Sequence, residues 1–224
     1  MRLPAFIAIV VVLAGSNALA MPTTNAPVST VTETTPALTE ELEEKTWSFS
    51  ASAYTYIVPD SREYVQPTFT ADRGSLHLEA RYNYEDLDTG SAWIGYNFSG
   101  GEKLAWELTP MLGGVFGETT GVAPGYKGSL SWWKLELYSE GEYVFDTDDS
   151  SESFFYSWSE LTLAPLDWFR FGLVTQRTRV YESDREIQRG VLAGFAYEMI
   201  DLSAYLLNPD EDKPTFIIAV GLTF

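Results

Sequence analysis

The one histidine of the chain lies between residue types that hydrolases use for nucleophilic catalysis. His77 alternates with Ser75 and Glu79, so on an extended strand the three side chains point to one face. A serine activated by a histidine and an acid would hydrolyse an ester, as a lipid-modifying enzyme does. Adjacency on one strand is weak evidence for a triad, because the three groups must also meet in the correct geometry. We therefore expect His77 to be a hydrogen-bonded structural side chain and predict that the chain is not an enzyme.

Carboxylates recur at alternate positions of a later stretch. Glu136, Glu140 and Glu142 would share one face of a strand over residues 134–146, with about 6–7 Å between successive same-face positions. Rows of carboxylates along a pore favour the entry of cations. If basic side chains such as Lys127 pair with these acids instead, the same residues form a hydrated, salt-bridged plug. The sequence leaves both interpretations open.

Composition argues against several other kinds of chemistry. The chain has no cysteine, which removes disulfides, thiol catalysis and thiolate metal sites. Its net charge of −18 is opposite to the basic surface that a nucleic-acid partner requires. Asp146, Asp148, Asp149 and Glu152 lie close together, but their spacing lacks the glycine and the twelfth-position glutamate of an EF-hand. We interpret them as a solvated acidic loop and expect neither a metal nor a cofactor.

The elements that must position these side chains are strands with a two-residue period. In residues 75–85 the apolar positions begin at Leu76 and Leu78, and charged residues alternate with them. Segments of this kind number about twelve, or ten if residues 102–132 are partly a loop. The expected strand ranges are 46–57, 64–72, 75–85, 90–99, 102–116, 122–132, 134–146, 153–164, 168–180, 186–199, 201–208 and 214–224.

The connections between the expected strands alternate in length. Those after odd strands are long or acidic, as in residues 146–152 and 208–213, whereas those after even strands are short, as in residues 72–74. Long loops at one end, short turns at the other and aromatic residues near strand ends are typical of a membrane barrel. In lipid all backbone groups must be paired, and closure removes the unpaired edges. We predict an all-β fold, a closed antiparallel transmembrane β-barrel over residues 46–224.

Two segments precede the expected barrel. Residues 1–20 combine Arg2, a short apolar run and the small-residue site Ala18-Leu19-Ala20, which together predict a secretory signal peptide cleaved after Ala20. An uncleaved anchor is the alternative, but the apolar run is too short to span a bilayer. Residues 21–45 are rich in Thr, Pro and Glu and contain no aromatic residue, so we expect a disordered periplasmic tail.

The sequence resembles the Gram-negative bacterial outer-membrane β-barrel class in its signal-peptide site and in its last strand, TFIIAVGLTF. Chains of this class typically end on phenylalanine, with apolar residues at every second position before it. The resemblance implies an outer-membrane location after Sec export, contact with membrane lipid and recognition by the barrel-assembly machinery. The residues that match this assembly signal are Phe216, Ile218, Val220, Leu222 and Phe224.

Within a barrel the two faces of each strand acquire different roles. The residues expected to line the lumen are His77, Glu79, Arg81, Glu107, Lys127, Glu136, Glu140, Glu142, Glu160 and Arg170. Strict alternation places Arg177, Arg179 and Arg189 on the lipid side near the outer rim, where arginine can bind lipopolysaccharide phosphates. A bulge that turns these arginines inward is the alternative.

The function expected from this arrangement is a narrow passive channel for small solutes or cations. A plugged barrel with a structural or partner-binding role is the alternative, and a lipid-modifying enzyme is the third possibility. The solute, the partner and the oligomeric state cannot be read from the sequence.

Overall fold

A computed structural model describes residues 46–180 and 186–224. The expected signal peptide, the expected tail and residues 181–185 lie outside the described residues, as do the side chains of Arg179, Val180 and Glu186. No helix in the described residues is long and apolar enough to cross a bilayer.

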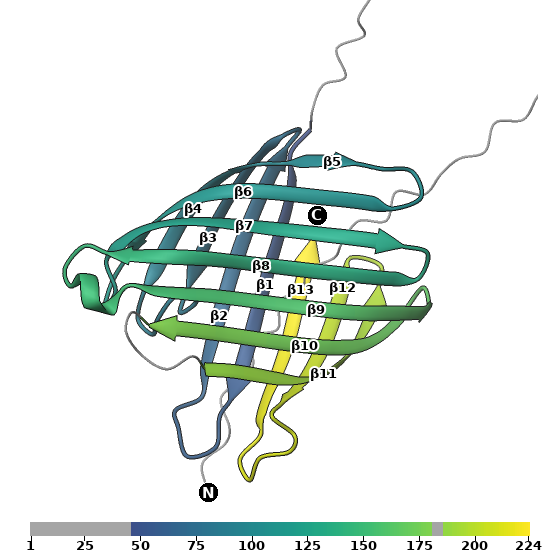
Figure 1. Cartoon of the computed structure of the whole chain (residues 1–224). Coiled ribbons are helices and arrows are strands. Elements are labelled where there is room, and N and C mark those ends of the chain that lie inside the picture. The colour runs from purple at the N-terminus through teal and green to yellow at the C-terminus, as the bar shows by residue number, and fades with distance from the viewer. Residues whose placement is uncertain (1–45, 181–185) are drawn as a thin grey trace, which may run out of the picture.

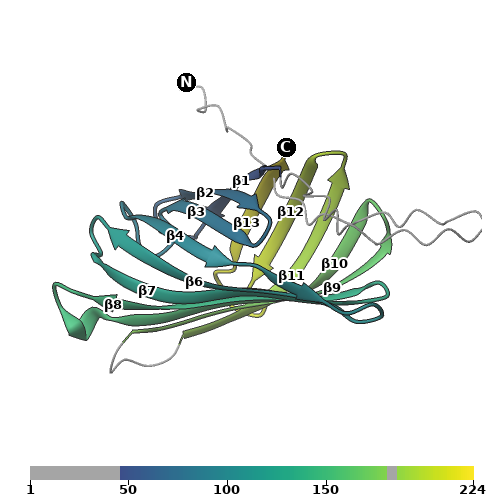
Figure 2. The same ribbon diagram turned by 90° about the horizontal axis from the view of Figure 1, so that it is seen from above.

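The described residues form one continuous wall of antiparallel strands that closes on itself (Figures 1 and 2). In Figure 1, β5 to β11 cross the front of the barrel, and β1 to β4 with β12 and β13 lie behind them. A short 3-10 helix, Ser150–Glu152, lies in the connection between β8 and β9. The strands are β1 (Ser48–Ile57), β2 (Tyr64–Arg73), β3 (Leu76–Tyr82), β4 (Gly90–Tyr96), β5 (Phe98–Gly100), β6 (Ala105–Phe116), β7 (Gly121–Trp132), β8 (Leu135–Asp146), β9 (Phe154–Leu166), β10 (Phe169–Val180), β11 (Glu186–Tyr197), β12 (Ile200–Leu207) and β13 (Thr215–Thr223).

The barrel wall has twelve strands rather than thirteen, because β4 and β5 are two parts of one interrupted strand. Both pair with β6 in the same register, and only Asn97 separates them. The Asn97 side chain donates to Asp72 at 2.7 Å and accepts from Thr109 at 2.7 Å. These bonds tie the interruption to β6, its neighbour in the wall, and to β2, which lies one strand further away. The expectation of a closed, twelve-stranded antiparallel barrel is confirmed, and the ten-stranded alternative is wrong, because residues 102–132 contain two long strands.

Short turns and both ends of the barrel wall share one end of the molecule, which we call the terminal end. The turns between β2 and β3, β7 and β8, β9 and β10, and β11 and β12 each contain two residues. Trp133 and Glu198 adopt positive φ angles of 55° and 53° in two of these turns, which lets the chain reverse within two residues. The longer connections lie at the opposite end, the long-loop end, as the alternation of loop lengths predicted.

The outer face of the wall is apolar, as the two-residue period requires. Large side chains such as Ile94, Leu112 and Leu173 are exposed on it, at 56%, 54% and 59%. A continuous apolar surface of this kind is unfavourable in water and marks a membrane-facing region. The outward residues of β13 include Phe216 and Ile218, which are both exposed. The barrel therefore presents the surface of a transmembrane protein.

Aromatic side chains surround the outer face near both rims. At the terminal end Trp47, Phe49 and Phe224 stack in sequence, with ring centroids 6.1 Å apart in each pair. At the long-loop end Tyr143 and Phe145 lie 4.6 Å apart. Such girdles occupy the two membrane–water interfaces of transmembrane barrels.

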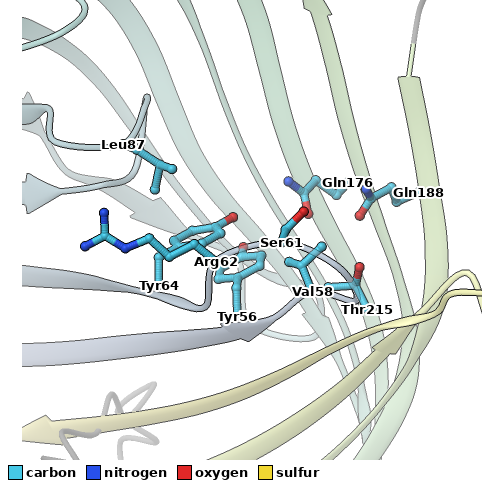
Figure 3. A pocket seen from close by; sticks show the side chains of 9 residues that line it. All are labelled: Tyr56, Val58, Ser61, Arg62, Tyr64, Leu87, Gln176, Gln188 and Thr215. Atoms are coloured by element: carbon cyan, nitrogen blue, oxygen red, sulfur yellow. The ribbon is translucent and has the colours of Figure 1, made fainter.

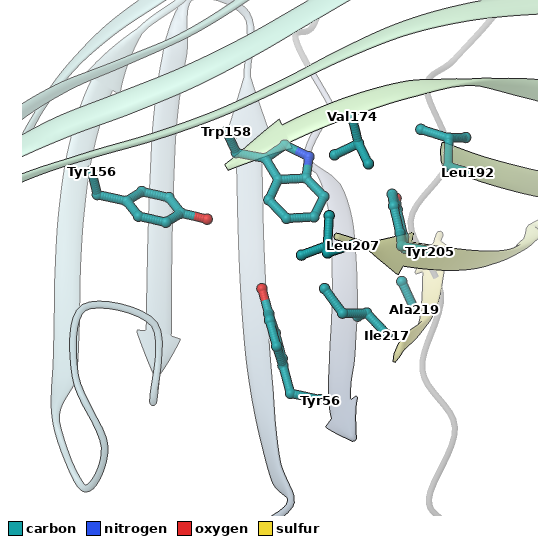
Figure 4. Packing of buried hydrophobic residues seen from close by; sticks show 9 residues of the cluster. All are labelled: Tyr56, Tyr156, Trp158, Val174, Leu192, Tyr205, Leu207, Ile217 and Ala219. Carbon is teal, nitrogen blue, oxygen red and sulfur yellow. The ribbon is translucent and has the colours of Figure 1, made fainter. Parts of the chain in front are cut away.

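The interior of the barrel holds two apolar clusters that the sequence analysis did not anticipate. Val174, Leu207 and Ile217 belong to the larger cluster and are almost completely buried, together with several aromatic residues (Figure 4). Met111 and Val144 belong to the smaller cluster, toward the long-loop end. The inward face therefore contains a packed apolar core in addition to the expected polar residues.

Deleting Phe224 should lower the yield of folded barrel several-fold. Phe224 and Phe49 exchange two backbone hydrogen bonds of 2.9 Å, and these close the terminal end between the first and last strands. The folded fraction can be measured by heat-modifiable mobility in gel electrophoresis. Deleting residues 21–40 is the control, since a segment with little to bury contributes little to folding. Equal loss from both deletions would contradict the assembly role of Phe224.

Candidate functional site

The ten predicted lumen residues all occupy inward-facing positions of the barrel. The strand register links Glu107, Ser129, Tyr138 and Glu160 across four neighbouring strands, so these side chains share the inner face. Glu107 is exposed and lies near the terminal end, whereas Glu79, Arg81 and Glu142 are buried. The interior of the barrel is therefore the candidate site.

Arg81 on β3 is the centre of a charged network that crosses the lumen. Its Nε donates to Glu79 at 2.5 Å and its Nη1 donates to Glu142 on β8 at 2.6 Å. β3 and β8 are not neighbours in the sheet, so the second bond spans the interior. The guanidinium also lies 4.2 Å from the ring centroid of Tyr84 and 4.4 Å from that of Trp93, between two aromatic faces. The Arg81 side chain is only 3% exposed, so water cannot replace a lost partner. Loss of one contact would therefore leave a buried polar group unpaired and weaken the whole network.

Lys127 and Tyr84 extend the network to Glu140. Lys127 on β7 donates to Glu79 at 2.5 Å and lies 3.8 Å from Glu140. Glu140 also accepts hydrogen bonds from Tyr84 at 2.5 Å and from Tyr138 at 2.7 Å. Lys127 on β7 contacts Glu79 on β3, and Tyr84 in the loop after β3 contacts Glu140 on β8. β3 is adjacent to neither β7 nor β8 in the wall, so the network forms a partition across part of the lumen.

Both ring nitrogens of His77 are occupied by carboxylates. Nδ1 lies 2.8 Å from Asp72 and Nε2 lies 3.0 Å from Glu79. No ring nitrogen is left to take a proton from Ser75, so the arrangement is that of a structural histidine. Asp72 was not among the predicted residues, although it lies near the end of β2, just before the turn that leads to His77.

The network contains more carboxylates than bases. Around Arg81, Lys127 and His77 lie five acids, which are Asp72, Glu79, Glu85, Glu140 and Glu142. Among the described side chains, Glu85 Oε2 and Glu142 Oε1 are buried and have no hydrogen-bond partner. Glu85 was absent from the list of lining residues, although it continues the alternation of the strand expected over residues 75–85. In the structure β3 ends at Tyr82, and Glu85 reaches the interior from the loop that follows.

The opposite side of the interior is aromatic. Trp158 on β9 lies 6.3 Å from Tyr54 on β1 and 5.3 Å from Tyr205 on β12, as ring centroids. Trp158 Nε1 and Tyr205 Oη donate to Glu160 at 2.8 and 3.0 Å. Figure 4 shows Trp158 and Tyr205 beside Val174 and Leu207. Glu160 is thus held by aromatic donors rather than by a base.

Arg170 forms a separate ion pair near the terminal end. Its guanidinium donates to both carboxylate oxygens of Asp201 and, at 2.7 Å, to Ser203 Oγ. Glu136 lies toward the same end and accepts from Ser131 at 3.2 Å. Asp201 was also missed, although its two-residue spacing from Ser203 places both on the inner face.

Two of the three arginines expected near the outer rim, Arg177 and Arg189, face outward. The β10–β11 register is regular from Phe169 to Thr178, so Arg177 and Arg189 remain on the outer face and the inward-turning bulge is wrong. Arg189 forms an exposed ion pair of 2.6 Å with Asp210, which lowers the pKa of that loop carboxyl. Arg177 lies 5.7 Å from the ring centroid of Phe155. The side chain of Arg179 is outside the described part of the chain.

No group of three or more metal-ligating side chains in residues 46–180 and 186–224 is arranged to hold a metal ion. The described interior contains ion pairs, hydrogen bonds and aromatic contacts.

No protein-family model and no curated protein matches the chain, but solved structures do. A KdgM porin superposes with a TM-score of 0.56 at 8% sequence identity, covering 78% of this chain and 99% of that chain. A KdgM porin in complex with disordered oligogalacturonate superposes with a TM-score of 0.55 at 9% identity, covering 79% and 99%. At this level of identity the likeness concerns the fold alone. It confirms the resemblance drawn from the sequence, because the chain has the fold of an outer-membrane β-barrel.

Proposed function

We propose that the protein is a narrow passive channel of the bacterial outer membrane that favours small cations and neutral solutes over anions. The observation that carries the proposal is the excess of carboxylates in the interior, including the unpartnered oxygens of Glu85 and Glu142. Carboxylates along a pore raise the local concentration of cations and exclude anions. The porin fold of the matching structures supports passage of small molecules through the same space.

The contacts across the lumen make the proposed channel narrow. Arg81–Glu142 and Tyr84–Glu140 are side-chain contacts between β3 or the loop after it and β8, and the backbone of the wall does not cross the interior. Because side chains alone form these contacts, rearrangement of the side chains can open a passage without unfolding of the wall. We therefore expect a low conductance, limited by the partition that the charged network forms.

A plugged, non-conducting barrel is the second candidate function. The observation in its favour is the close packing of Trp158, Leu207 and Ile217 across one half of the interior. Such a barrel would act through its loops or its N-terminal tail as a structural or partner-binding protein.

The proposal includes a membrane orientation and partners. With the short turns and both ends of the barrel wall on the periplasmic side, the long loops would face the outside of the cell. Arg177 and Arg189 then lie near the outer leaflet, where they would bind lipopolysaccharide phosphates. Phe216, Ile218, Val220, Leu222 and Phe224 would serve as the signal for the barrel-assembly machinery. We propose no enzymatic activity, in keeping with the occupied ring nitrogens of His77.

Recording in planar bilayers tests the proposal. Purified protein should produce small conductance steps, and a salt gradient should give a reversal potential of the sign expected for cation selectivity. A folded barrel without any conductance would favour the plugged alternative.

A further inference from the structure

A pocket at the long-loop end lies apart from the charged network. It has a volume of about 340 Å³ and is formed where β1, β2, β10, β11 and β13 end, with Leu87 above it (Figure 3). This volume is near the lower limit for small-molecule sites in proteins. Its Tyr56 belongs to the larger apolar cluster, and Val58 and Tyr64 pack against that cluster. The cluster therefore gives the pocket a closely packed floor.

Two stacked tyrosines form one side of the pocket. Tyr56 and Tyr64 are direct cross-strand partners, with ring centroids 4.7 Å apart and planes inclined by only 7°. Tyr56 is buried, and Tyr64 is partly exposed. Tyr56 thus supports the ring of Tyr64 from behind, and Val58 adds an aliphatic surface. A rigid aromatic and aliphatic surface of this kind suits the C–H face of a ring-shaped ligand.

The other side of the pocket offers neutral hydrogen-bonding groups. Gln176 and Gln188 are cross-strand partners on β10 and β11, and Ser61 and Thr215 contribute hydroxyls. Figure 3 shows Gln176 and Ser61 directed toward the same space. Gln176 Oε1 is buried and has no hydrogen-bond partner among the described residues. A buried acceptor without a donor is unfavourable, so rotation of the Gln176 amide toward a ligand hydroxyl in the pocket would be favoured.

The charge of the pocket differs from that of the lumen. Of the nine residues that line it, only Arg62 is charged, and Arg62 is exposed. The chain as a whole carries a net charge of −18, which disfavours an acidic ligand. The pocket therefore suits a neutral molecule with several hydroxyl groups and one apolar ring face.

We infer that this pocket binds a neutral saccharide of one or two pyranose rings. The ring stacks on Tyr64, and its hydroxyls bond to Gln176, Gln188, Ser61 and Thr215. Passage of the saccharide onward rests on the proposed channel function, whereas binding rests on the pocket alone.

Equilibrium dialysis of maltose against the full, folded barrel in detergent tests the inference. We expect saturable binding with a Kd on the order of 1 mM. Gln176→Leu and Tyr64→Leu should each weaken binding about fivefold or more, as expected for a lost hydrogen bond or ring contact. Thr175→Leu is the matched control, because Thr175 precedes Gln176 on β10, is exposed on the outer face and should leave the Kd unchanged. Folding of each variant is verified by heat-modifiable mobility, and Gln188→Leu replaces any variant that fails to fold.

Three results would overturn the inference. The first is the absence of saturable maltose and glucose binding to the folded wild type. The second is unchanged affinity in both pocket variants. The third is tighter binding of galacturonate than of maltose, which would assign the pocket to acidic ligands through Arg62. Parallel conductance recordings separate the two proposals. Conductance without saccharide binding would contradict only the proposed binding site, and saccharide binding without conductance would contradict only the proposed channel.

Discussion

Replacing Arg81 with methionine should lower the free energy of unfolding by about 3–5 kcal/mol, because removing one partner of a buried ion pair leaves the other charges uncompensated. Glu79, Glu85 and Glu142 all lie within 3.5 Å of the Arg81 guanidinium, and each of these four side chains is at most 3% exposed. Methionine fills most of the space between Tyr84 and Trp93 but supplies no positive charge. The change can be measured by urea titration of the purified barrel in micelles.

Arg189→Met is the control for this experiment. Its ion pair with Asp210 is more than half exposed on both sides, and exposed pairs contribute about 0–1 kcal/mol. A second test adds Glu142→Gln to Arg81→Met, which removes one uncompensated charge and should restore part of the lost stability. If Arg81→Met costs no more than Arg189→Met, the network across the lumen does not stabilise the barrel.

The double change of Glu140 and Glu142 to glutamine should lower the preference for cations over anions several-fold. Both carboxylates lie on the inner face of β8, and neutral amides remove two of the charges that attract cations. The amide carbonyl introduced at position 140 can still accept from Tyr84 and Tyr138, so the wall should remain folded. Reversal potentials in a salt gradient measure the change. The effect should weaken as salt rises, since the screening length is about 10 Å at 0.1 M.

A matched control removes the same charge outside the lumen. Asp148 and Asp149 are exposed in the connection between β8 and β9, and changing both to asparagine alters the net charge equally. This variant should keep the selectivity of the wild type. Anion selectivity of the unmodified protein would contradict the proposed function, and an equal effect of both double variants would show that overall charge, rather than the lumen, sets the selectivity.

The sequence by itself determined the wall of the barrel. The face to which each side chain points follows from the two-residue period of a strand, which is a local property. Alternation therefore places Leu76 and Leu78 on the outer face and Glu79 on the inner face. Antiparallel pairing alone also places the connections after odd-numbered strands at one end of the barrel and those after even-numbered strands at the other. The same reasoning kept Arg177 and Arg189 on the outer face, where the regular register of β10 and β11 places them.

The tertiary structure decided what fills the interior. Arg81 and Glu142 are 61 positions apart, and Tyr84 and Glu140 are 56 apart, so only the closing of the wall brings them together. Alternation shows that Leu207 and Ile217 share a face with polar residues, but it cannot show that they meet one another and bury their surfaces there. The local backbone sets whether a side chain points into the lumen, whereas contact between side chains across the lumen depends on the diameter and strand stagger of the whole barrel. For this reason the sequence predicted the inward direction of ten lining residues but missed Asp72, Glu85 and Asp201. Only the three-dimensional structure showed a partition of ion pairs beside an apolar core.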